Sequence, residues 1–136
     1  MGTFGAIGIA GSALGTYRKW LDAVSDNLAN VNTVRSTNET AFQARYIVAQ
    51  ANDTQGGDSG GVHVAGAAYG SAVGRVVYEP NNPLADADGN VRYPDIDMAS
   101  QMTQLIMAQR GYQANLAVVD RARDAYSAAL QLGRNA

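Results

Sequence analysis

The stretch from Ile7 to Val31, IGIAGSALGTYRKWLDAVSDNLANV, decides the fold of this 136-residue chain. Its apolar residues return at alternating intervals of three and four, which is the spacing of a coiled-coil seam. The seam positions are Ile7, Ala10, Leu14, Tyr17, Leu21, Val24, Leu28 and Val31. The pattern predicts a long amphipathic helix in the first part of the chain.

A second stripe of this kind runs through the last third of the chain. Its members are Met98, Met102, Leu105, Ala108, Tyr112, Leu116, Val119, Ala122, Tyr126 and Leu130. Because an aspartate side chain accepts hydrogen bonds from the first N–H groups of a helix, Asp95 or Asp97 is expected to cap this helix after Pro94. The pattern fades at Gly133.

The residues between the stripes have a different composition. Four runs there have the features of strands, and two segments rich in turn residues separate them. The runs are 42–50, 61–66, 74–80 and 90–94, and the turn segments are 52–61 and 80–90. The predicted fold is therefore mainly α with a small, irregular β element. Residues 1–33 plus 95–136 form the paired helices, and residues 34–94 form the inserted β element.

Glycine is frequent in the first predicted helix, at Gly5, Gly8, Gly11 and Gly15. Each glycine costs a helix interior about 1 kcal/mol relative to alanine. Such a helix is expected to be marginal alone and to order against a partner. Glycine also allows two backbones to approach closely, so these positions are expected at a helix contact.

The composition excludes several classes of protein. The net charge is −2 and the sequence pI is about 5.1, without the basic stripe of a nucleic-acid-binding protein. The chain has no cysteine, which excludes disulfides and thiolate metal sites. The first residues lack the basic region of a secretory signal, and Arg18 and Lys19 interrupt the apolar span that a membrane helix needs. These features alone indicate the cytoplasm.

Catalytic patterns are scarce. The single histidine, His63, lies in a predicted strand, and the chain has only two glutamates, Glu39 and Glu79. The serines form no Gly-x-Ser-x-Gly elbow, and no glycine-rich phosphate loop follows a predicted strand. We therefore expect no enzyme activity, cofactor, small-molecule substrate or nucleic-acid partner. The contributions of His63 and of the glycine-rich loop 56–61 are open.

The segment Leu84–Asp95, LADADGNVRYPD, is the best candidate for a metal site. Aligned on an EF-hand loop, it places Asp86, Asp88 and Gly89 at the third, fifth and sixth positions. Leu84 stands where the first carboxylate belongs, and Asp95 replaces the bidentate glutamate. A tight turn at Asp88-Gly89 between extended segments is the better interpretation.

Three motifs then resemble the flagellar basal-body rod and hook proteins. SDNLANVNT (25–33) is similar to their N-terminal signature, and DMASQMTQLIMAQRGYQANLAVV (97–119) to their C-terminal helix. PNNPLADADGNVRYPDID (80–97) is similar to the segment that distinguishes proximal-rod members. The matching positions at the two ends are Asn27, Ala29, Asn30, Thr33, Met102, Gln109, Arg110, Tyr112, Ala114 and Asn115. The chain departs from the family at Gln101, where a glutamate is usual, and at Gln104, where an asparagine is usual.

The resemblance implies a structural part of the flagellar rod, exported without a cleaved signal peptide to the periplasm-spanning rod of the basal body. It implies other proximal-rod proteins, the distal rod protein, the adaptor to the membrane (MS) ring, that ring and copies of the chain itself as partners. The implied fold pairs the two terminal helices as an antiparallel coiled coil, and the implied role is torque transmission. The residues expected at the assembly interface are Leu14, Leu21, Val24, Asn27, Leu28, Asn30, Asn32, Met102, Leu105, Arg110, Tyr112, Asn115, Leu116 and Val119.

The three asparagines at the end of the first helix, Asn27, Asn30 and Asn32, carry a hypothesis of their own. An amide offers two donors and an acceptor without adding charge, so these side chains are expected where neighbouring subunits meet. A plain helix end with exposed amides is the simpler alternative. The two helices alone also fit a cytoplasmic coiled-coil adaptor or export chaperone, with which the asparagine motif does not agree.

Overall fold

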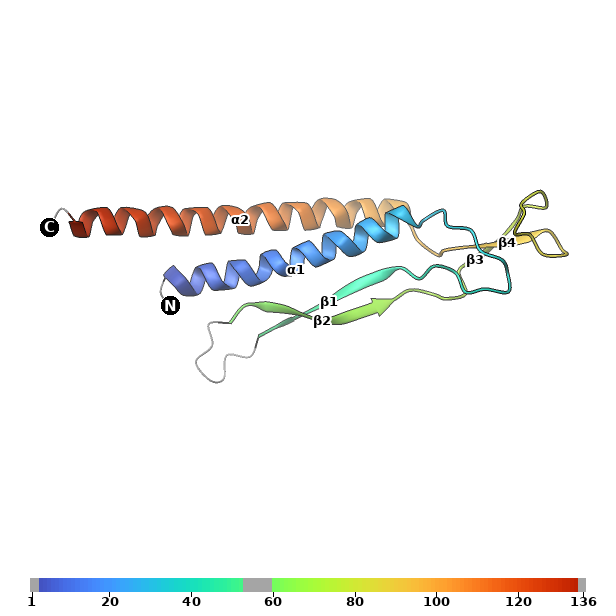
Figure 1. The fold of residues 1–136 in the computed structure, drawn as a ribbon, viewed down its shortest axis with the longest axis horizontal. Coiled ribbons are helices and arrows are strands. Elements are labelled where there is room, and N and C mark those ends of the chain that lie inside the picture. The colour runs from blue at the N-terminus through green and yellow to red at the C-terminus, as the bar shows by residue number, and fades with distance from the viewer. Residues whose placement is uncertain (1–2, 53–59, 135–136) are drawn as a thin grey trace.

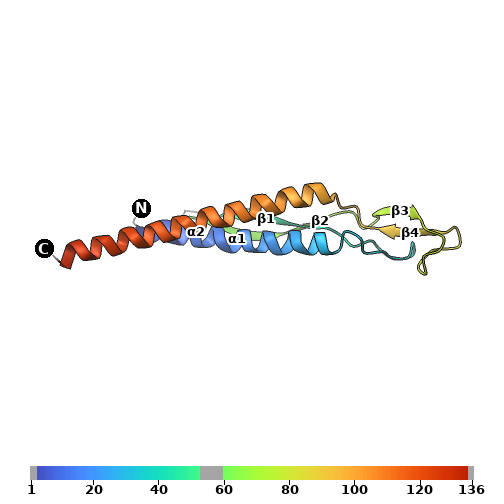
Figure 2. The same ribbon diagram turned by 90° about the horizontal axis from the view of Figure 1, so that it is seen from above.

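Two long helices, packed side by side in opposite directions, dominate the fold (Figures 1 and 2). The computed structural model describes residues 3–52 and 60–134. Helix α1 spans Thr3–Ala29 and helix α2 spans Met98–Arg134. Neither of these helices, within the residues described, is long and apolar enough to cross a membrane. The prediction of a mainly α fold with terminal helices and a small β element is confirmed.

Two separate β-hairpins connect the helices. The first pairs β1 with β2 and the second pairs β3 with β4, both antiparallel. Their bounds are Arg45–Ala51 for β1, Val62–Tyr69 for β2, Arg75–Tyr78 for β3 and Asn90–Tyr93 for β4. All four predicted strands are present. The predicted glycine-rich loop lies in large part outside the described residues.

The two hairpins occupy different places (Figure 1). The β1–β2 hairpin lies along α1, on the side away from α2, and contacts it through both strands. Its half-buried Ile47 and Val64 alternate with exposed neighbours, as expected for strands with one covered face. The β3–β4 hairpin extends from the end of the helical pair and is tied to the segment after α1 by a backbone bridge between Arg35 and Arg92.

Helix α2 begins at an aspartate cap. Asp97 Oδ1 accepts a hydrogen bond from the Ala99 N–H and Asp97 Oδ2 accepts one from the Ser100 N–H, both at 3.2 Å. Pro94, fully buried, precedes the cap, where a helix could not extend backward through it. Of the two caps that the sequence allows, the structure selects Asp97.

Gly11 and Gly15, expected at a helix contact, make none within the protomer. A Cβ added at Gly11 or Gly15 would meet no atom within 4 Å, so these residues face open space. The close contact lies instead at Gly111 of α2, where an added Cβ would stand 2.3 Å from Cε1 of Tyr17. The Tyr17 ring is stacked on Trp20, with centroids 6.0 Å apart. Gly111 therefore makes the room in which this ring sits between the helices.

Part of the predicted α2 stripe also faces the wrong way. Met98 is 50% exposed and Met102 is 48% exposed, whereas Gln101 is 2% exposed and Ala108 is fully buried. Leu116, Tyr126 and Leu130 are exposed as well. The periodicity predicts an apolar inward face from the first turn of α2. The first buried residue of α2 is instead Gln101, which has a polar amide side chain. The last turns of α2 extend beyond the start of α1, which cannot cover them (Figure 1).

A turn organised by Asp86 closes the connection between β3 and β4. Asp86 Oδ1 accepts hydrogen bonds from the backbone N–H groups of Asp88 and Asn90, and Asp86 Oδ2 accepts one from the Thr37 hydroxyl. Gly89 has a φ of 79°, a left-handed conformation that favours glycine. The predicted Asp-Gly turn is confirmed, at the end of a longer connection. No group of three acidic or histidine ligands occurs among the described residues.

We predict that acid loosens this connection. Hydrogen bonds from Asn82 and Tyr93 lower the pKa of Glu79 below 4.5, and those from Asn90 and Thr37 lower the pKa of Asp86 below 3.8. A lowered carboxyl pKa stabilises the folded state above the unfolded value, and this contribution is lost as pH falls through the lowered pKa. Faster backbone amide exchange at Asn90, corrected for intrinsic rates, is expected below pH 3.8 but not at pH 6. Equal protection at both pH values would contradict this.

The substitution Gly111→Ala is expected to lower the thermal unfolding midpoint. Its Cβ displaces the Tyr17 ring from its place beside Trp20, and such overpacking costs about 1–3 kcal/mol. The same change at Gly15, in open space, removes a glycine from a helix and is worth about 1 kcal/mol of stabilisation. Circular dichroism of the two variants separates these effects. A midpoint for Gly111→Ala that equals or exceeds that of Gly15→Ala would refute the packing role of Gly111.

Candidate assembly site

The side chain of Asn27 joins three elements of the fold at one point. Its Nδ2 donates to the Arg45 carbonyl at 3.0 Å and to Oε1 of Gln101 at 3.0 Å. Its Oδ1 accepts from the Arg45 N–H at 2.8 Å. Asn27 is fully buried. The last turns of α1, the first turns of α2 and the start of β1 are therefore held by a single amide.

The burial of this contact makes it strong. A hydrogen bond contributes about 1 kcal/mol net, but a buried polar group left without a partner costs about 1–3 kcal/mol. The Asn27 amide satisfies both the N–H and the carbonyl of the Arg45 backbone. It therefore makes the two hydrogen bonds that a neighbouring strand would otherwise make. The Arg45 guanidinium also pairs with Asp26, the residue before Asn27. The start of β1 is thus fixed to α1 by its backbone and by its side chain.

The other two asparagines have different roles. Asn30 Nδ2 donates to the Asp26 carbonyl at 2.9 Å, and Asn30 Oδ1 accepts from the Thr33 hydroxyl at 3.0 Å. These bonds satisfy one of the carbonyls that a helix end leaves without a partner and fix the turn that follows. Asn32 is exposed. Only Asn32, of the three, keeps its side chain on the outside of the protomer.

The helix ends are enclosed by a small apolar cluster next to the amide. Val31, Ala44 and Ile96 are buried together, and Phe42 packs against them. They come from the segments that follow α1, precede β1 and precede α2. This cluster shields the region where the three chain segments meet, which raises the cost of an unpaired amide there.

The predicted assembly residues divide into two groups. Most of them lie buried or half-buried within the protomer: Leu14, Leu21, Val24, Asn27, Leu28, Asn30, Leu105, Tyr112, Asn115 and Val119. Four of them are exposed: Asn32, Met102, Arg110 and Leu116. The first group builds the protomer's own helical pair, and the exposed group leaves side chains available for other molecules.

Sequence analysis missed Gln101 and Arg45 as partners of Asn27. Gln101 was noted only as a departure from the family's glutamate. It lies seven residues before Ala108, a spacing that places both on one face of a helix. Asn27 lies three residues after Val24 and four before Val31, so the same rule places its amide on the inward face. The Arg45 backbone partner has no sequence signal, because any residue could provide those groups.

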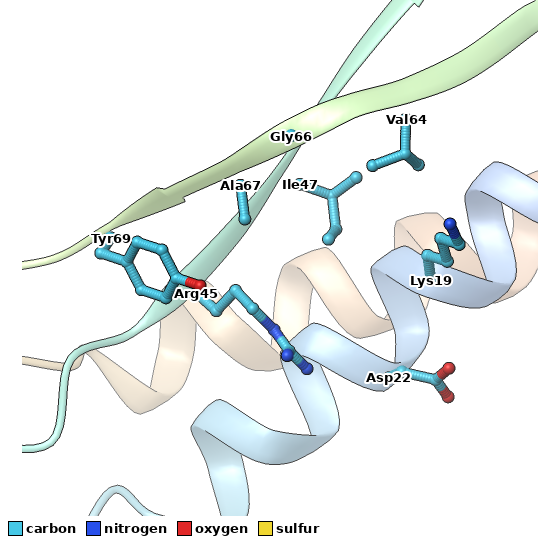
Figure 3. A pocket seen from close by; sticks show the side chains of 8 residues that line it. All are labelled: Lys19, Asp22, Arg45, Ile47, Val64, Gly66, Ala67 and Tyr69. Atoms are coloured by element: carbon cyan, nitrogen blue, oxygen red, sulfur yellow. The ribbon is translucent and has the colours of Figure 1, made fainter.

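A hollow of about 330 Å³ lies between α1 and the β1–β2 hairpin (Figure 3). Its lining combines both signs of charge with apolar and small residues: Lys19, Asp22, Arg45, Ile47, Val64, Gly66, Ala67 and Tyr69. The single histidine lies elsewhere, where His63 Nδ1 stands 2.7 Å from the amide oxygen of Asn52. Its neighbour there is the amide of Asn52. The arrangement is that of a protein surface formed where a hairpin rests on a helix.

Comparisons with known proteins agree with this geometry. The family described as "Flagella basal body rod protein" matches residues 7–35, and "Flagellar basal body rod FlgEFG protein C-terminal" matches residues 87–132. These matches cover α1 with the segment after it, and β4 with most of α2. Together with the paired terminal helices, they define a flagellar basal-body rod protein, a structural component of the flagellum.

Comparison with individual relatives identifies the family within the flagellar rod proteins. The chain is 38% identical over 126 residues to the flagellar basal-body rod protein FlgC of Salmonella typhimurium, covering 93% of this chain and 94% of the relative. It is 27% identical over 150 residues to the FlgC of Bacillus subtilis, covering 98% of this chain and all of the relative. The chain therefore belongs to the FlgC family.

We predict that Asn27→Ala destabilises the protomer by about 2–4 kcal/mol. The change leaves both backbone groups of Arg45 and the Gln101 amide without their buried partner, at about 1–3 kcal/mol for each group that stays dry. The control is Asn32→Ala, which removes an exposed amide from the same motif and should stay within about 0.5 kcal/mol of the original chain. Urea unfolding monitored by circular dichroism measures both. Equal stability of the two variants would contradict the assignment.

Proposed function

We propose that this chain is a subunit of the proximal rod, which stacks with copies of itself and with other axial proteins to transmit motor torque. Similarity over nearly the whole chain to FlgC proteins carries the proposal. The fold supports it, because the helices leave apolar surface uncovered at both ends of the pair. A part that bears torque needs contacts along its whole length.

The proposed partners are those of a rod segment: other proximal-rod proteins, the distal rod protein, the adaptor to the membrane ring and that ring. Residues 1–33 plus 95–136 would form the rod core, with residues 34–94 outside it. The exposed members of the predicted interface, Asn32, Met102, Arg110 and Leu116, would contact neighbours directly. Asn27 would act within the protomer by fixing the helix ends that neighbours bind.

The proposed location is the periplasm-spanning rod of the basal body, after export as an unfolded chain without a cleaved signal peptide. Exposed Gly11 and Gly15 support this, because they weaken α1 until a partner covers it. The role is structural and not catalytic in this proposal.

Mass spectrometry of purified hook–basal bodies, compared with the cytosol of the same cells, tests the proposal. We expect the chain in the basal bodies, with its first residues present. Recovery in the cytosol alone would leave the helical pair intact as a fold and would favour an adaptor or export chaperone instead. A shortened N-terminus in the basal-body fraction would contradict the mode of export.

A further inference from the structure

The solvent side of α2 carries an apolar ridge near its start. Met98, Met102 and Ile106 recur at every fourth residue, which places them one above the other on a helix. They are 50%, 48% and 49% exposed, and Met107 beside them is 57% exposed. We call Met98, Met102 and Ile106 the methionine ridge. Apolar surface of this extent on a soluble protein marks a contact with another molecule.

The charges around the methionine ridge restrict what can cover it. From Met98 to Gln109 the sequence has no charged residue. Exposed Asp95 and Asp97 precede this run, and exposed Arg110 follows it. A surface that is uncharged along the same length and cationic at the end that meets the two aspartates complements this one.

The first half of α1 has these properties. From Thr3 to Tyr17 it contains no charged residue, and Arg18 and Lys19, both exposed, follow directly. Its solvent side presents Gly8, Gly11 and Gly15. Open space above Gly11 and Gly15 leaves room for bulky, flexible side chains such as methionine.

We propose that the methionine ridge of one copy packs on the first half of α1 of a second copy, in antiparallel orientation. Asp95 and Asp97 of the first copy then face Arg18 and Lys19 of the second. Because α1 and α2 are antiparallel within the protomer, two copies stacked in the same direction bring these helices together in this orientation. The inference rests on the proposed rod function, for which it specifies one contact.

The two surfaces lie at opposite ends of the helical pair (Figure 1). A contact between two different patches is heterologous, and when its rotation does not close a ring it continues as an open helical filament. Each added copy presents a new methionine ridge at one end and a new α1 surface at the other. The pairing therefore gives the stack a direction.

Cross-linking tests the contact, and the chain has no natural cysteine to interfere. Met102→Cys and Gly11→Cys are placed in the same chain, and basal bodies isolated from cells producing it are treated with a short bis-maleimide. We expect a ladder of covalent multimers from the double variant and none from either single variant. The matched control combines Met102→Cys with Ser25→Cys, an exposed position in the other half of α1 that should give no ladder.

A charge exchange provides a second, independent readout. Arg18→Glu and Asp95→Arg are each expected to reduce swimming severalfold, and the double variant to restore it, because the pair is only reversed. Arg18→Glu combined with Asp124→Arg should not be rescued. Circular dichroism establishes that each single variant folds.

The outcomes separate this inference from the proposed function. Basal bodies that contain the chain but give no ladder, or a ladder equal to that of the Ser25 control, would overturn the contact and leave the rod assignment standing. Additive losses in the charge exchange would overturn it as well. Absence of the unsubstituted chain from basal bodies would overturn both.

Discussion

The fold depends on one buried amide. The two helices and the β1–β2 hairpin come from three distant parts of the sequence, and the hydrogen bonds of Asn27 join all three. An apolar residue there could fill the space but would leave the Arg45 backbone groups unsatisfied, at a cost of about 1–3 kcal/mol each. A charged residue would have to be desolvated among apolar neighbours. The asparagine amide carries its donors and its acceptor on one carbon and has no charge. It therefore satisfies the Arg45 backbone without the cost of burying a charge.

The same constraint accounts for the departure at Gln101. A glutamate at this position could also accept a hydrogen bond from Asn27, but it would bring a negative charge into a site that is 2% exposed. Glutamine keeps the accepting oxygen and removes the charge. The departure from the family's usual residue therefore preserves the contact while changing its electrostatics.

Sequence periodicity predicts the elements because it depends on local geometry. The helices and all four strands follow from spacing and turn residues alone, and capping preferences narrow the start of α2 to Asp95 or Asp97. The site is harder to predict, since its decisive partners are 18 and 74 residues away from Asn27. Hydropathy also treats every polar position as exposed, so the predicted stripe includes Met98 and Met102, which are half-exposed in the protomer, and gives no reason to expect Gln101 inside. The four glycines of α1 are conspicuous because they are many, whereas Gly111 of α2, against which the Tyr17 ring packs, has no other glycine near it in its helix.

A weak first helix and an uncovered ridge have a common physical consequence. Within the protomer, Gly11 and Gly15 of α1 gain nothing from close packing, and the methionine ridge on α2 is left half-exposed. Both features cost stability in an isolated chain, because glycine favours the unfolded state and exposed apolar surface favours aggregation. In the proposed assembly a neighbouring subunit supplies the missing surface, which offsets both costs. The amide at Asn27 then has a defined task, because it gives the incoming chain one geometry in which helices and hairpin order together.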